Sequence, residues 1–282
     1  AMAAARRRGL DDAATADALG NAGTQAAGLW QFLETGAMSK HLHAGHASEA
    51  GVRAAELAAH GFTGPPAILE GPKGFFAGLC PDADPDAVLR DPAAPWELHR
   101  TSIKPWPSCR HTHAAIDAAA SLRDAIAGRP IAHVAVETYR ATLDLCDRPD
   151  QGTEYGAKFS LQHCVAAALS LPLVDFAAFD APARTSLAPL RARVACRVAD
   201  RFAAAYPRDW GGAVAVTLAD GETLAAERNH AKGDPEAALD APALREKARM
   251  LLHHGGVADA DGLIAAILAL ADDAPPPALD IV

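Results

Sequence analysis

Residues 38–76 read MSKHLHAGHASEAGVRAAELAAHGFTGPPAILEGPKGFF. Lys40 and three histidines crowd the beginning of this stretch, an alanine-rich run follows, and Gly and Pro residues end it. The pattern predicts a loop over residues 40–45, a helix over about residues 46–60 with Gly61 as its C-cap, and then a turn. The cationic beginning is either a solvated helix start or a site for an anion.

On the N-terminal side of this stretch, apolar residues recur at helical spacing in two runs. They predict two helices within residues 1–36, with Asp11 or Asp12 as an N-cap. The abundance of small residues there indicates helices that pack closely together.

On the C-terminal side, a connector rich in Pro and Asp over residues 81–95 leads into a mixed pattern. Alternating or β-branched runs predict strands over residues 98–106, 131–139 and 192–198, and a hairpin over residues 213–226 that turns at Asp220-Gly221. Helices are predicted over residues 111–126 and 158–171. The helical period returns in two helices after residue 241, before a tail at residues 274–282.

The fold class that follows is mainly α with an α+β second domain. We expect a helical domain over residues 1–97, interrupted by a smaller α+β domain over residues 98–235 and resumed over residues 236–282. No internal repeat is visible.

Composition excludes several classes of function. The net charge of −9 and the absence of a basic stripe argue against nucleic acid as a partner. No apolar run is long enough to span a membrane, and the first residues do not read as a signal peptide. The five cysteines are odd in number and form no C-x-x-C pair, which predicts free thiols in the cytoplasm and no zinc or disulfide framework.

A second cationic cluster, KPWPSCRHTH, occupies residues 104–113 just before a predicted helix. It could form an anion-binding edge with His113 as acid or base. Cys109 could instead pair with a histidine as a nucleophile or belong to a Cys/His metal site. His163 lies on an otherwise apolar helix, where a lone histidine is usually a satisfied core residue.

Lys40 could bind a carboxylate, act as a base, or be a solvated lysine. His43 follows three residues later and can face the same way. As metal ligands, His41, His43 and His46 lack a nearby carboxylate and a familiar spacing, so we predict no metal site.

These stretches, in their order, resemble the MmgE/PrpD family. The resemblance is carried by SKHLHAGHASEAGVRAAELAAHGFTGPPAILEGPKGFF, by ALGNAGTQAAGLWQFLETGAMSK before it, and by KPWPSCRHTHAAIDAA and AKFSLQHCVAAAL after it. The family includes 2-methylcitrate dehydratase, cis-aconitate decarboxylase and iminodisuccinate epimerase. The resemblance implies a large helical and a smaller α+β domain, a homodimer, and work on di- and tricarboxylates without a metal or organic cofactor.

The resemblance also implies roles for particular residues. Lys40 matches the active-site lysine of the family's S/T-K-x-x-H motif, His113 or Cys109 matches the Pro-Ser-Cys-x-x-x-His segment, and His163 stands where many members carry a tyrosine. We therefore expect Lys40, His113 and His163 to be catalytic. Substrate-binding roles are expected for His43, Cys109, Arg110 and His111.

Full members of the family have further N-terminal helices that supply an aspartate and histidines. This chain is therefore expected to be a fragment, to be given without those residues, or to receive them from a partner chain. We accordingly expect this chain alone to have an incomplete site.

The implied chemistry is proton abstraction α to a carboxylate, with cations stabilising the charge that develops. The predicted function is a carbon–oxygen lyase that resembles 2-methylcitrate dehydratase of propionate metabolism. An epimerase or decarboxylase of the same family, and a non-catalytic carboxylate-binding subunit, are the alternatives.

Overall fold

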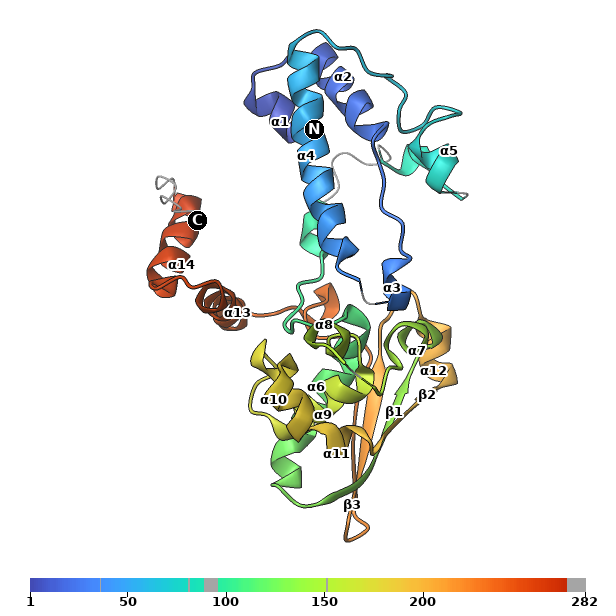
Figure 1. The fold of residues 1–282 in the computed structure, drawn as a ribbon, viewed down its shortest axis with the longest axis vertical. Coiled ribbons are helices and arrows are strands. Elements are labelled where there is room, and N and C mark those ends of the chain that lie inside the picture. Colours follow the sequence, from blue (N-terminus) through green and yellow to red (C-terminus); the bar gives the residue numbers. More distant parts are fainter. Residues whose placement is uncertain (36, 81, 89–95, 151, 273–282) are drawn as a thin grey trace. The chain divides into compact units, whose positions relative to one another are not determined.

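The computed structural model describes residues 1–35, 37–80, 82–88, 96–150 and 152–272. Its contacts divide the chain into two compact units, Ala1–Pro95 and Trp96–Val282, whose elements are labelled in Figure 1. Of the predicted connector, only residues 82–88 are described, and the predicted tail at residues 274–282 lies outside the described residues.

The first unit is entirely helical in its described part. Its elements are α1 (Met2–Arg7), α2 (Asp12–Gly23), α3 (Phe32–Thr35), α4 (Ser39–Ala59), α5 (Phe75–Leu79) and the 3₁₀ turn η1 (Pro85–Val88). The predicted cap at the start of α2 is confirmed, because the Asp11 carboxylate accepts a hydrogen bond from the Ala14 N–H at 2.9 Å. Gly61, with φ of +80°, follows α4 as predicted.

Small residues pack this unit. A buried cluster joins α1, α2 and α4 through Ala5, Ala18, Ala55 and Ala58. A Cβ at Gly20 would lie 2.7 Å from the Pro65 backbone, and one at Gly64 would lie 2.3 Å from the carbonyl oxygen of Asp17. Both positions therefore need glycine, because the backbone after α4 presses directly on α2.

Two predictions for this unit are wrong. Residues 40–45 form no loop, since α4 runs without interruption from Ser39. The intervening residues lack proline, and one interior glycine, Gly45, costs only about 1 kcal/mol in a helix. Of the second predicted helix, only the short helix α3 forms. Gly28, with φ of +130°, is not helical and so prevents an earlier start. Trp30, which was predicted to pack on this helix, is exposed.

The second unit combines a four-stranded sheet with helices. Its strands are β1 (Ile131–Thr138), β2 (Val194–Val198), β3 (Gly212–Leu218) and β4 (Thr223–Arg228). Its helices are α6 (His113–Ile126), α7 (Arg140–Cys146), α8 (Glu154–Ala157), α9 (Leu161–Ser170), α10 (Ala181–Ser186), α11 (Ala188–Arg191), α12 (Asp200–Ala205), α13 (Ala241–His254) and α14 (Ala260–Leu268). The 3₁₀ turns in the described part of this unit are η2 (Glu97–Arg100), η3 (Arg110–Thr112), η4 (Ala177–Phe179), η5 (Pro235–Ala237) and η6 (Ala269–Asp272).

The sheet has the order β2-β1-β3-β4, with β1 parallel to β2 and the other two pairs antiparallel. The predicted strands over residues 131–139 and 192–198 are confirmed as β1 and β2. The predicted hairpin is confirmed as β3 and β4, with Gly221 at φ of +91° in its turn. Alternate residues of β3 are buried, which matches a sheet covered on one face.

Helices α6 and α9 build the core beside this sheet (Figure 1). Helix α6 contacts β3, β4 and α9, and it buries an apolar stripe that includes Ile116, Leu122 and Ile126. Residues Leu161 to Leu169 of α9 are all buried. Because every side of this helix faces the core, a charged residue anywhere between Leu161 and Leu169 would be buried. Helix α9 accordingly carries no charged residue.

The predicted strand over residues 98–106 is wrong. This segment contains η2 and then an irregular stretch up to Pro105 and Pro107, and proline cannot donate to a strand ladder. The predicted C-terminal helices are confirmed as α13 and α14, which pack together, and His254 stacks on Phe176 at 3.8 Å between ring centres. The return of residues 236–282 to the helical domain stays a prediction.

No helix in the described part of the chain combines the length and the apolar character needed to cross a lipid bilayer.

Candidate functional site

The cationic segment over residues 104–113 is a tightly bonded loop that ends in α6. The Lys104 ammonium donates to the Ser108 carbonyl at 3.1 Å, and the Ser108 and Thr112 hydroxyls are 2.9 Å apart. The Cys109 N–H donates to the Lys158 carbonyl at 2.8 Å, which ties the loop to the segment before α9. These bonds fix the backbone on both sides of Arg110.

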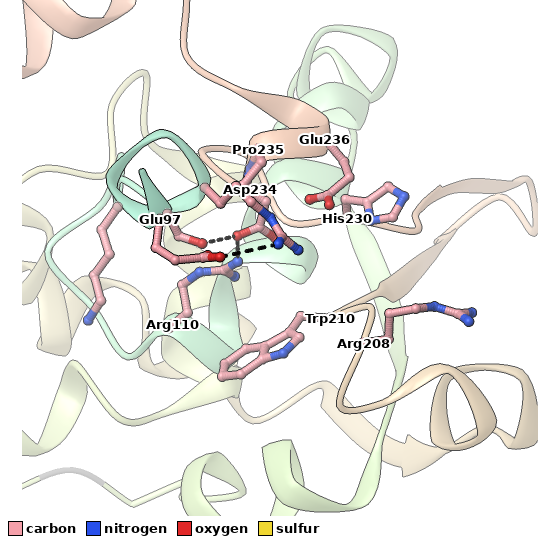
Figure 2. A pocket seen from close by; sticks show the side chains of 11 residues that line it. Glu97, Arg110, Arg208, Trp210, His230, Asp234, Pro235 and Glu236 are labelled. Atoms are coloured by element: carbon pink, nitrogen blue, oxygen red, sulfur yellow. Dashed lines mark hydrogen bonds and ion pairs between the residues drawn. The ribbon is translucent and has the colours of Figure 1, made fainter. Parts of the chain in front are cut away.

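Arg110 forms an ion pair with Asp234, and both side chains are largely buried. Asp234 also accepts hydrogen bonds from the Ser102 hydroxyl at 2.6 Å and from the Ala231 N–H at 3.1 Å. The Arg110 guanidinium lies over the Trp210 ring at 5.1 Å, as Figure 2 shows. Burial lowers the pKa of Arg110, but a guanidinium still remains charged at neutral pH.

His111 belongs to an aromatic cluster beside this pair. Its ring stacks on Trp210 with 4.5 Å between ring centres, and its Nδ1 lies 2.8 Å from the Tyr139 hydroxyl. Tyr139 in turn stacks on Tyr206 at 4.4 Å. Burial lowers the pKa of His111 to about 4, and the charges of Arg110 and Lys104 add to this shift. His111 is therefore a neutral imidazole at pH 7.

Arg110, Asp234 and Trp210 line a pocket of about 450 Å³, whose side chains are drawn in Figure 2. Four basic side chains line it against three acidic ones, and the complete lining consists of Glu97, Arg100, Ser102, Lys104, Arg110, Arg208, Trp210, His230, Asp234, Pro235 and Glu236. Against a chain of net charge −9, this lining is a local concentration of cations that suits an anionic ligand.

His113 is fully buried at the start of α6, edge-on to the Trp106 ring at 5.2 Å. Neither of its ring nitrogens makes a hydrogen bond within the described residues. Burial, together with the charges of Arg110 and Lys104, lowers its pKa to about 3, although the nearby Ser108 backbone opposes the shift. A buried polar group without partners costs about 1–3 kcal/mol, which makes His113 a candidate for a role other than stability.

His163 is also fully buried, on α9. Its Nε2 donates to the Ala178 carbonyl at 2.8 Å, whereas its Nδ1 has no hydrogen-bond partner in the described part of the chain. Burial lowers its pKa, so the ring is neutral. Neither His113 nor His163 is among the residues that line the pocket around Arg110.

Lys40 and His43 lie three residues apart on α4, in the first unit. Lys40 is exposed. His43 packs edge-on against Phe32, with 5.5 Å between ring centres, and lines a separate hollow of about 450 Å³ with His46 and the residues around α3. The predicted residues thus divide between the units: Cys109, Arg110, His111 and His113 share one segment of the second unit, and His163 packs behind it on α9.

The described residues contain no group of three or more His, Cys, Asp or Glu side chains arranged to hold a metal ion.

Sequence reasoning missed Asp234, Trp210 and Tyr139. No local pattern marks Asp234 as the partner of a residue more than one hundred positions away. The one available signal is Gly233, which has φ of +94° and whose Cβ would clash with the carbonyl oxygen of Ile103. A glycine before Asp-Pro indicates a tight turn, and here that turn presents Asp234 to Arg110.

Acidification is expected to destabilise the second unit because the pKa values of His111 and His113 lie below the usual 6.5. The unfolded chain takes up protons below about pH 6.5, whereas the folded chain does not until about pH 4 or 3. The free energy of unfolding should therefore be highest above pH 6.5. Protonation of each histidine in the unfolded chain should lower it by about 2 kcal/mol by about pH 5.

Urea titrations across this pH range measure the effect. The His111→Gln and His113→Gln variants should each show a shallower dependence on pH, and His133→Gln, an exposed position on β1, should not. An unfolding free energy that does not change between pH 7 and pH 5 would contradict the assigned pKa values.

Comparison with family models gives two matches. The MmgE/PrpD N-terminal domain matches residues 1–88, and the MmgE/PrpD C-terminal domain matches residues 106–272. Among curated proteins, no match is found.

Proposed function

The chain belongs to the MmgE/PrpD family, and on this premise we propose that it is a lyase acting on a short-chain di- or tricarboxylate. The family includes hydro-lyases. The proposed reaction begins with removal of a proton α to a carboxylate and ends with loss of a hydroxyl group, as in 2-methylcitrate dehydratase. We further propose that the protein acts as a homodimer.

The observation that carries this proposal is the cationic pocket around Arg110, whose loop continues into His111 and His113. Arg110 and Lys104 come from the same short loop, and both face a space that could hold a small polycarboxylate. A guanidinium binds a carboxylate through two parallel hydrogen bonds. In this proposal the substrate carboxylate replaces part of the ion pair that Arg110 now forms with Asp234.

His113 is the proposed proton-transfer group. A pKa of about 3 makes it a weak base in the empty site. A bound anion nearby would raise that pKa, since an opposite charge favours the protonated imidazole. Substrate binding would thus convert a neutral, unpaired ring into an effective base.

Lys40, on the first unit, and His163 are further residues for which we propose a catalytic role. An ammonium such as that of Lys40 stabilises the negative charge that builds up on the substrate carboxylate. His163 would act through Nδ1, because Nε2 is bonded to the Ala178 carbonyl. His43, His111 and Cys109 are proposed to contact the substrate.

One observation favours a second candidate, a carboxylate-binding protein without turnover. Arg110 already forms a largely buried ion pair with Asp234. A carboxylate can therefore lie against Arg110 without any reaction, as it would in a protein that only binds its ligand.

A substrate panel tests both candidates. The purified protein is incubated with 2-methylcitrate, citrate and cis-aconitate, and products are identified by NMR in deuterated water. Loss of water supports the lyase, solvent deuterium without loss of water supports an epimerase, and release of carbon dioxide supports a decarboxylase. Binding by calorimetry without any product would support the second candidate and contradict the proposed lyase.

Lys40→Ala is expected to lower turnover by at least about 100-fold, because removal of one group that stabilises developing charge typically costs 10²–10³ in rate. The fold should be unaffected, since Lys40 is exposed. Steady-state kinetics of Lys40→Ala and of Lys73→Ala, an exposed lysine of the same unit, give the comparison. Equal turnover in the two variants would remove Lys40 from the machinery.

A further inference from the structure

Three thiols gather around the cationic loop. Cys109 precedes η3 and is partly exposed, whereas Cys146 at the end of α7 and Cys164 on α9 are fully buried. Both buried thiols belong to the hydrophobic core against which Cys109 packs. The Cys109 side chain raises the pKa of the Cys146 thiol, so the two groups lie within interaction range of each other. Helix α7 is also in direct contact with η3, so the two cysteines lie on adjoining elements.

The three thiols differ in chemistry. Cys109 is the one that solvent reaches, and Arg110 lies within electrostatic range of it. A neighbouring cation favours the thiolate, which is the form that attacks an oxidant. Cys164 instead interacts with the hydroxyls of Thr112 and Ser108, and burial raises its pKa to about 12. Cys109 is therefore the thiol placed to react first, and Cys146, at the end of the helix that contacts η3, is the partner that the fold offers it.

We propose that Cys109 and Cys146 form a redox modification site, at which hydrogen peroxide or a related peroxide converts the two thiols into a reversible disulfide.

The reaction balances in two steps. The Cys109 thiolate attacks one peroxide oxygen, the O–O bond breaks, and hydroxide leaves while Cys109 becomes a sulfenic acid. The hydroxide takes the proton of Cys146. The Cys146 thiolate then attacks the Cys109 sulfur, the S–O bond breaks, and a second hydroxide leaves and is protonated. Two thiols lose two electrons and two protons, and the peroxide becomes two molecules of water.

Closing this bond would disturb the neighbouring site. Two unbonded thiol sulfurs are farther apart than the about 2.05 Å of a disulfide, so the loop before η3 must move toward α7. Arg110 is the next residue, and His113 follows three positions later. Oxidation should therefore stop carboxylate turnover, a consequence that rests on the proposed function, whereas the disulfide itself does not.

Mass spectrometry of the full chain treated with hydrogen peroxide tests the site. The intact mass should fall by that of two hydrogen atoms, a protease digest should contain a peptide pair linked through Cys109 and Cys146, and dithiothreitol should reverse both changes. Cys109→Ser should abolish the cross-link. Cys196→Ser, at a partly buried position on β2, should keep it.

Cys146→Ser alters a buried position, so circular dichroism must first show that it is folded. Cys109→Ser has a partly exposed side chain and carries the test if the other variant does not fold. A link from Cys109 to Cys164, oxidation of Cys109 without any link, or no reaction would overturn the proposal. Because the readout is mass, a cross-linked protein that turns over no carboxylate when reduced would count against the proposed lyase alone.

Discussion

His113→Gln is expected to lower kcat for the carboxylate substrate by about 10²–10⁴-fold, the usual contribution of a positioned acid or base. Glutamine keeps a polar amide near the Nε2 position but cannot carry a proton at neutral pH. The residues that line the pocket are untouched, so KM should change little. Steady-state kinetics on His113→Gln measure the split between kcat and KM.

His133→Gln is the matched control, because His133 is exposed on β1. His113→Phe adds a stability measurement. It should be inactive but at least as stable as the parent, since it removes a buried imidazole whose nitrogens have no hydrogen-bond partner in the described residues. Loss of stability together with normal kcat would assign His113 a purely structural role.

Asp234→Ala is expected to reduce the free energy of unfolding by about 3–5 kcal/mol, the typical result of removing one member of a buried ion pair. It leaves the Arg110 guanidinium buried without its carboxylate, and it removes the acceptor for the Ser102 hydroxyl and the Ala231 N–H. Chemical denaturation followed by circular dichroism measures the loss.

Two controls separate the charge from the packing. Glu49→Ala breaks the exposed pair with Arg53 and should cost no more than about 1 kcal/mol. Combining Asp234→Ala with Arg110→Met removes both charges and should recover part of the loss, since no unpaired charge stays buried. A loss below about 1 kcal/mol for Asp234→Ala would mean that water replaces the carboxylate without difficulty.

Local patterns predicted the second unit best. The alternation in IAHVAVETY, the Asp220-Gly221 turn and the apolar period of α6 and α9 each reflect a preference that lies within a few residues. The errors arose where that preference was weak. The cationic beginning of α4 was mistaken for a loop because its charges suggested a site, although nothing in it breaks a helix.

Only one part of the candidate site, the loop that carries Arg110, could be predicted from the sequence. Its loop is contiguous, so Arg110, His111 and His113 were visible as a cluster. The residues that contact this loop lie far from it in the sequence. The hydrogen bond between Ser102 and Asp234, for example, joins residues 132 positions apart. Such a contact depends on the sheet that brings residues 209–234 beside the loop, and no short-range spacing records it.

The positions of the tryptophans should allow the pocket to be followed by intrinsic fluorescence. Trp30 and Trp96 are largely exposed, whereas Trp210 lies against Arg110 and His111 and Trp106 lies against His113. The emission of the last two indoles therefore depends on the charge and the position of the groups proposed to bind and transform the substrate. The chain carries its own optical reporter, with which occupancy of the pocket could be followed before any product is known.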